Sequence, residues 1–178
     1  MFSQFKPTWM LRSIYDLTPC EAQKNNIKVV LTDLDNTLIA WNNPQGTPQL
    51  RQWLIQMQNA KISVIVITNN SEKRAQYALN QLKLPFIARA LKPFDHGIKQ
   101  AMKRYGVSPN EVVMVGDQMM TDILAANNAH VRSILVKPLV DSDALGTKIN
   151  RFFEKQIKKI LVKKGQLKLN WRQTLDER

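Results

Sequence analysis

The sequence predicts an α/β fold in which a parallel β-sheet is covered by helices on both faces. Three short runs, at 28–33, 62–67 and 112–116, are rich in Val and Ile and nearly continuous in apolar character, as in strands that are buried on both sides. Helical patterns separate these runs, and an alternation of strands and helices is typical of a parallel sheet. We therefore expect a three-layer, Rossmann-like architecture.

Further elements are expected between these runs and after the last of them. Residues 132–136 form another apolar run, and a short strand is expected at 86–90. Thr47 followed by Pro48 is a favourable helix start, because Thr can cap the helix and Pro suits its first position. This helix is expected to reach about residue 60. Other helices are expected from Ser71 to about Leu82, at 95–105 and at 118–128.

The composition is that of one globular domain with a large excess of positive charge. The length of 178 residues and the hydrophobic share of 44% fit a single domain over 1–178, with a core at about 27–137. Lys and Arg number 26 against 14 Asp and Glu, a net charge of +12, so the expected partners are anionic: phosphorylated substrates, an acidic membrane surface or nucleic acid. The sequence shows no membrane span or secretory signal, and we expect a cytoplasmic protein.

Polar side chains gather at the carboxyl ends of the expected strands, where parallel sheets bind their ligands. Asp33 and Asp35 end the first strand, and their spacing places both on one side because side chains alternate along a strand. The other strand ends contribute Thr68, Asn69, Asn70, Lys92, Asp117 and Asp122. Carboxylates together with a lysine, a hydroxyl and amides suit a phosphate group held with Mg²⁺, which prefers oxygen ligands.

Four motifs in this order resemble those of the haloacid dehalogenase-type phosphatases, subfamily IIIA. They are DLDNTL at 33–38, TNN at 68–70, KP at 92–93, and GDQ at 116–118 followed by Thr121 and Asp122. The resemblance covers about residues 27–137. Longer segments, including TNNSEKR at 68–74 and RALKP at 89–93, look like the YqeG family, which is similar to the yeast mitochondrial phosphatidylglycerophosphate phosphatase.

The resemblance implies a Mg²⁺-dependent phosphatase that forms an aspartyl-phosphate intermediate. Asp33 would be the nucleophile and also a metal ligand, together with Asp117 and the backbone carbonyl of Asp35. Asp35 would protonate the leaving alcohol and then deprotonate the attacking water. Asp122 would orient the metal-binding groups.

Other residues of the motifs are expected to hold the substrate. Thr68 would bind a phosphate oxygen, and Lys92 would neutralise negative charge on the nucleophile and the phosphoryl group. The remaining substrate contacts are expected from Asn69, Asn70, Arg74 and Arg89.

The spacing of the motifs predicts an open site without a cap domain. One helix and a short loop separate Asp35 from the second strand, and one helix and a short strand separate Asn69 from Lys92. An open site suits phosphate on something large, such as a lipid in a bilayer, a protein or a nucleic acid. The family resemblance implies the lipid reaction, in which phosphatidylglycerophosphate is converted to phosphatidylglycerol.

A basic amphipathic helix is expected at about 147–164. Its apolar side would hold Ile149, Phe152, Phe153, Ile157, Ile160 and Leu161 among many lysines. Such a helix can lie on an anionic membrane, with shallow contacts added by Phe2, Phe5, Trp9 and Met10, as in a peripheral protein on the inner face of the membrane. The alternative is that it packs its apolar side against its own domain.

Two other functions stay open at this point. The first is a phosphatase of soluble nucleotide, sugar or protein phosphate. The second is a non-catalytic module on a phosphatase fold that binds nucleic acid or an assembly partner. The net charge of +12 favours such a module, whereas the complete set of chemical residues, from Asp33 to Asp117, favours catalysis.

Overall fold

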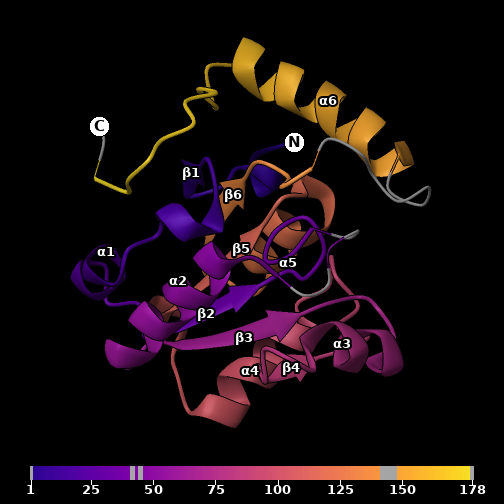
Figure 1. Cartoon of the computed structure of the whole chain (residues 1–178). Helices are drawn as coiled ribbons and strands as arrows, with labels where there is room; N and C mark the ends of the chain where they lie inside the picture. The colour runs from indigo at the N-terminus through magenta and orange to yellow at the C-terminus, as the bar shows by residue number, and fades with distance from the viewer. Residues whose placement is uncertain (1, 41–42, 44–45, 141–147, 177–178) are drawn as a thin grey trace.

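The chain folds as a six-stranded parallel sheet covered by helices on both faces (Figure 1). This computed structural model describes residues 2–40, 43, 46–140 and 148–176. The strand order is β1-β6-β5-β2-β3-β4, and every adjacent pair is parallel. The strands are β1 (Trp9–Leu11), β2 (Val29–Thr32), β3 (Ser63–Ile67), β4 (Phe86–Ile87), β5 (Val112–Gly116) and β6 (Arg132–Val136).

The helices largely follow the sequence pattern. They are α1 (Pro19–Lys24), α2 (Pro48–Asn59), α3 (Glu72–Leu79), α4 (His96–Tyr105), α5 (Leu124–Asn128) and α6 (Lys148–Lys163), with 3-10 turns at Ser3–Phe5, Ile14–Asp16 and Pro109–Glu111. One difference lies in the helix expected at 118–128, which begins as a π-helical turn at Met119–Ile123 and only then becomes α5.

Alternate side chains of β2 fill two different cores. Val30 belongs to a cluster that includes Trp53 of α2 and also takes in residues of α1 and α3, so these helices cover one face of the sheet. Leu31 belongs to a second cluster with Ile98 of α4 and Ala125 of α5 on the other face. The period of two along a strand thus separates the helical layers, and the predicted three-layer fold is confirmed.

Two of the N-terminal residues that were expected to contact a membrane are buried in the fold. Met10 of β1 pairs with Leu135 of β6, and Phe5 and Met10 are buried in one cluster. The prediction that these two residues supply shallow membrane contacts is therefore wrong. Trp9 is partly buried, with the Arg132 guanidinium 5.6 Å from its ring centroid. The strand β1 was not expected, since three residues are too few to show a period.

The C-terminal helix α6 uses part of its apolar side for packing. Ile157 and Leu161 are buried in the cluster that holds Phe5 and Met10, and Figure 1 shows α6 lying above β1 and β6. Phe153 is 50% exposed. The side chains of two other predicted members of the apolar side, Ile149 and Phe152, lie outside the described residues. Among the helices of the described ranges, none is long and apolar enough to cross a bilayer.

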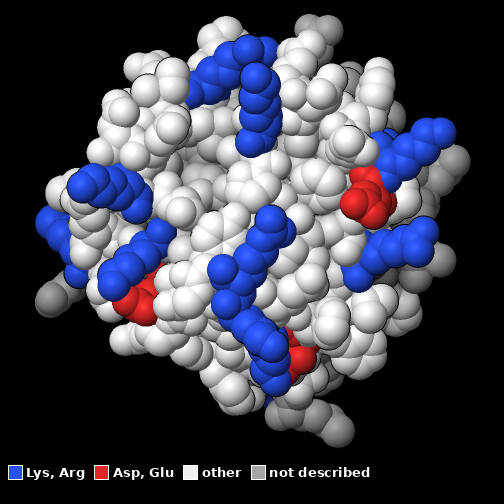
Figure 2. Space-filling model, turned by 90° about the horizontal axis from the view of Figure 1, so that it is seen from below, with Lys and Arg blue, Asp and Glu red and all other residues white. Residues whose placement is uncertain are grey.

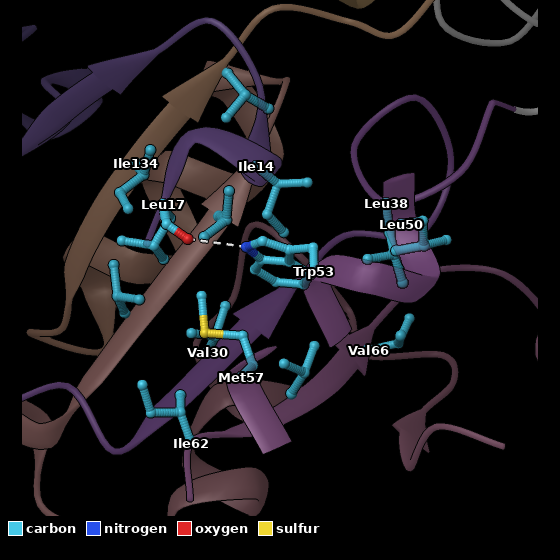
Figure 3. Close-up of a cluster of buried hydrophobic side chains, with 14 of the residues drawn as sticks. Ile14, Leu17, Val30, Leu38, Leu50, Trp53, Met57, Ile62, Val66 and Ile134 are labelled. Carbon is cyan, nitrogen blue, oxygen red and sulfur yellow. Dashed lines mark hydrogen bonds between the residues drawn. The ribbon is translucent and has the colours of Figure 1, made fainter. Parts of the chain in front are cut away.

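Trp53 links α2 to the segment before α1. Its indole Nε1 donates a hydrogen bond of 2.8 Å to the carbonyl oxygen of Leu17 in the middle of the larger core (Figure 3). We expect Trp53→Phe to lower the free energy of unfolding by about 1–3 kcal/mol, because the Leu17 carbonyl then stays buried without this donor. The midpoint and slope of urea unfolding measure this change. The matched Trp171→Phe change, at a partly buried ring, should cost less, and an equal cost would contradict the role of the hydrogen bond.

Candidate active site

Four charged side chains meet at the carboxyl ends of the central strands. Asp33 follows β2, Asp117 follows β5, Lys92 follows the short strand β4, and Asp122 lies in the π-helical turn. The Nζ of Lys92 is 2.6 Å from Oδ1 of Asp33 and 2.7 Å from Oδ1 of Asp122. The lysine side chain is only 3% exposed, so both ion pairs are buried. Residues far apart in the sequence therefore form one site.

The carboxylates of this site form a compact cluster. Asp33, Asp117 and Asp122 each place one oxygen within 4.8 Å of the others, and all three residues are buried. The Thr37 hydroxyl donates to Oδ1 of Asp117 at 3.1 Å. Three carboxylates against the single ammonium of Lys92 leave an excess of buried negative charge, which is costly unless a cation offsets it. Oxygen donors of this kind fit a hard divalent cation such as Mg²⁺.

Gly116 makes room for Asp122. A Cβ at position 116 would overlap the carboxylate of Asp122, so the aspartate reaches the cluster only because β5 ends on a residue without a side chain. The backbone N–H of Gln118 donates to Oδ2 of Asp122 at 3.1 Å. The π-helical turn thus brings Asp122 back against the strand end, with one oxygen on Gln118 and the other on Lys92.

The environment changes the proton affinity of these groups. Burial raises the pKa of Asp33 to about 6, although the adjacent Lys92 acts in the opposite direction. Burial also raises the pKa of Asp122 above its usual value. Burial by itself lowers the pKa of Lys92, but the carboxylates of Asp122 and Asp33 outweigh it and raise that pKa above its usual value. The lysine is therefore charged at neutral pH and holds both carboxylates.

The TNN motif after β3 holds the loop that carries Lys92. The side-chain amide of Asn69 donates to the Lys92 carbonyl and accepts from the Lys92 N–H, both at 2.8 Å. Thr68 is buried, and its Oγ1 accepts from the N–H of Asn70 at 3.1 Å. Asn69 therefore positions the backbone of Lys92, a role that its spacing did not predict. Its expected contact with substrate stays a prediction.

Asp35 lies on the solvent side of the buried cluster. Its Oδ2 accepts from the side-chain amide of Asn70 at 2.7 Å, and its Oδ1 is paired with Nη2 of Arg74 at 3.0 Å. The Asp35 side chain is 28% exposed. Arg89 is exposed, and its backbone N–H donates to the Asn70 carbonyl at 3.0 Å. Of the two predicted substrate-binding arginines, Arg74 thus contacts Asp35 through its side chain, and Arg89 is linked to Asn70 through its backbone.

Two residues that support the site were assigned no role from the sequence. Thr37 was visible within DLDNTL but was given no role, and Gly116 was visible as the residue before Asp117. Their roles depend on contacts with Asp117 and Asp122 across the site, which the local pattern does not indicate.

The fold and this site define the class of the protein. Residues 5–136 match the family model described as haloacid dehalogenase-like hydrolase, and the chain belongs to this family. It is 35% identical over 163 residues to "Probable phosphatase YqeG" of Bacillus subtilis (strain 168), a match that covers 92% of this chain and 95% of that protein. The expected family and its enzyme class, a phosphatase, are thereby confirmed.

Two solved structures share the fold. An uncharacterized protein from Listeria monocytogenes serotype 4b superposes with a TM-score of 0.53 at 14% identity, covering 75% of this chain and 99% of that one. The cobalt-bound form of deoxy-D-mannose-octulosonate 8-phosphate phosphatase from Haemophilus influenzae has a TM-score of 0.50 at 19% identity, covering 79% and 91%. At these identities the likeness concerns the fold alone.

Proposed function

We propose that this phosphatase hydrolyses phosphomonoesters in a Mg²⁺-dependent reaction through an aspartyl-phosphate on Asp33. The observation that carries the proposal is the buried cluster in which Lys92 bridges Asp33 and Asp122 beside Asp117. A carboxylate and a phosphate repel each other, so a nucleophilic aspartate needs nearby positive charges to offset this repulsion. The lysine supplies one such charge.

The metal would be held by Asp33, Asp117 and the backbone carbonyl of Asp35. Asp122 would keep the cluster in place through its bonds to Lys92 and Gln118. When bound, Mg²⁺ would neutralise charge on the phosphate and on the Asp33 carboxylate.

The reaction would proceed in two displacements at phosphorus. A carboxylate oxygen of Asp33 attacks, the bond from phosphorus to the leaving oxygen breaks, and Asp35 gives its proton to that oxygen. A water molecule then attacks the phosphorus, Asp35 takes up its proton, and the bond between Asp33 and phosphorus breaks to release inorganic phosphate. Thr68 would hold a phosphate oxygen during both steps, and Lys92 would stabilise the charge.

Asp35 has to change partners during this cycle. In the structure it is bound to Asn70 and Arg74, so protonation and contact with the leaving oxygen require that these bonds loosen. An anionic substrate could draw Arg74 away, because its guanidinium is about half exposed at the mouth. We therefore propose that the substrate is contacted by Arg74, Arg89, Asn69 and Asn70.

Protons are expected to compete with Mg²⁺ in this site. Since burial raises the pKa of Asp33 to about 6, the carboxyl group takes up a proton below that pH, and the metal must displace it. We expect the affinity for Mg²⁺ to fall about tenfold per pH unit below about pH 6 and to level off above it. Calorimetric titration of the metal-free protein measures this. Asp33→Asn should bind more weakly with a flatter pH profile, and an unchanged slope in the variant would contradict the assignment.

Phosphatidylglycerophosphate is the substrate that we propose, with phosphatidylglycerol as the product. Three features favour a substrate in which the phosphate is attached to a large molecule. The segment between Asn69 and Lys92 holds only α3 and β4, the mouth carries exposed arginines, and the chain has a net charge of +12. The chain would act as one domain over 1–178, in the cytoplasm and peripheral to the membrane.

Phosphate release from a substrate panel tests this proposal. The panel contains phosphatidylglycerophosphate dispersed in detergent and a set of soluble nucleotide, sugar and protein phosphates, each with Mg²⁺ and with chelator. Release from the lipid that exceeds release from every soluble ester, and that the chelator stops, is the expected result. Release from soluble esters alone would support the proposed reaction but reject phosphatidylglycerophosphate as the substrate.

A nucleic-acid-binding module is less well supported. On the face in Figure 2 the Lys and Arg side chains form several groups, and some lie beside acidic residues. The complete set of chemical residues, from Asp33 to Asp117, favours catalysis over such a module.

A further inference from the structure

We propose that residues 91–94, at the mouth of the active site, dock the enzyme on an anionic lipid bilayer through the side chains of Leu91 and Phe94. This inference deepens the proposed function, since it rests on a lipid as the substrate. It also differs from the sequence-based expectation, which assigned membrane contact to the N-terminal and C-terminal segments.

Leu91 and Phe94 are large apolar side chains directed to solvent beside a buried catalytic group. Leu91 is 59% exposed and Phe94 is 69% exposed. Between them, the Lys92 side chain is 3% exposed and contacts Asp33. Single exposed apolar residues are common on protein surfaces. Here two of them flank a lysine of the active site in the sequence, so a surface that covers this loop would lie close to that site.

Hydrogen bonds restrain the loop in a conformation that exposes these side chains. Leu91 has a φ of 58°, a backbone region that is costly for a bulky residue and that glycine would occupy more easily. Asn69 binds both backbone polar groups of Lys92, and the amide of Asn128 donates to the Pro93 carbonyl at 3.0 Å. A loop whose backbone is already restrained loses less conformational freedom on docking than a free one.

Three exposed cations lie near the same site. The side chain of Arg74 reaches Asp35, and the backbone of Arg89 is bound to Asn70, which also contacts Asp35. Lys73, beside Arg74 in the first turn of α3, is also exposed. Basic residues next to exposed apolar side chains fit an anionic bilayer, in which the charges meet the head groups and the apolar groups enter the interface. A bilayer in this position would also present its lipid phosphates to Asp33.

Two other exposed apolar side chains offer a competing surface on α6. Phe153 is 50% exposed and Val162 is 42% exposed. This surface lies on an element whose residues Ile157 and Leu161 pack into the fold beside Phe5 and Met10. Phe153 therefore provides a matched control for Phe94, as an exposed Phe elsewhere on the same protein.

The test is sedimentation of the full chain with vesicles that contain phosphatidylglycerol and phosphatidylcholine. We expect the double variant Leu91→Ser/Phe94→Ser to partition onto the vesicles at least about tenfold more weakly than the wild type, since two apolar side chains no longer enter the interface. Phe94→Trp should retain binding, because tryptophan is favoured at membrane interfaces. Phe153→Ser should bind as the wild type does.

Phosphate release from the lipid in vesicles and in detergent separates docking from catalysis. If docking is correct, the double variant loses activity on vesicles far more than on dispersed lipid. Wild-type binding by the double variant, or loss of binding in Phe153→Ser alone, overturns the proposal. If the wild type binds through the loop but releases no phosphate from the lipid in either form, docking holds and the substrate assignment fails.

Discussion

Replacement of Asp33 by Asn is expected to reduce phosphate release by at least about a thousandfold. A carboxamide has the shape of the carboxylate but is a far weaker nucleophile toward phosphorus, so the first displacement stops. The fold should persist, because Lys92 keeps its bond to Asp122 and one buried negative charge is removed. Steady-state phosphate release from the best substrate of the panel, together with thermal unfolding, measures both parts of this expectation.

The matched control for this variant is Asp176→Asn. Asp176 is 55% exposed and is paired with Lys24 on the surface, so the same chemical change there should leave the rate within about twofold. A rate for Asp33→Asn within about tenfold of the wild type, in a folded protein, would show that Asp33 is not the nucleophile.

Lys92→Met is expected to remove activity and also to destabilise the fold. The change keeps the length of the side chain but leaves the carboxylates of Asp33 and Asp122 buried without their shared ammonium. Loss of one partner of a buried ion pair typically costs about 3–5 kcal/mol. Urea unfolding of the protein without divalent cations measures the loss, and Lys24→Met, at a 61% exposed side chain, serves as the control with little expected change.

The cost of Lys92→Met should depend on pH in a definite direction. Burial already raises the pKa of Asp33 and Asp122 in the wild type, and removal of the ammonium raises both further. The protonated carboxyl groups are neutral, so the variant regains stability as the pH falls through these pKa values and loses it as the pH rises. We expect a larger deficit at about pH 8 than at about pH 5. Equal deficits at both pH values would contradict the burial of two charged carboxylates around Lys92.

Local chemistry was sufficient to predict most of the architecture. The apolar runs at β2, β3, β5 and β6 identified the centre of the sheet, because strands that are buried on both faces must be apolar along their length. Thr47 caps α2 by accepting from the Leu50 N–H at 3.2 Å, as its position before a proline predicts. Parallel sheets bind their ligands at the carboxyl ends of the strands. Since Asp33, Lys92 and Asp117 all follow strands of one parallel sheet, they were expected to be neighbours.

The tertiary structure decided which side chains support these residues and which surface is exposed. Thr37 reaches Asp117 across 80 positions of the sequence, and Asp122 fits only against the bare backbone of Gly116. Phe5 and Met10 are buried, whereas Leu91 and Phe94 face solvent. All four are apolar, so local pattern does not distinguish them. Burial depends on how β1, α6 and the loop after β4 pack, and that packing is a property of the whole chain.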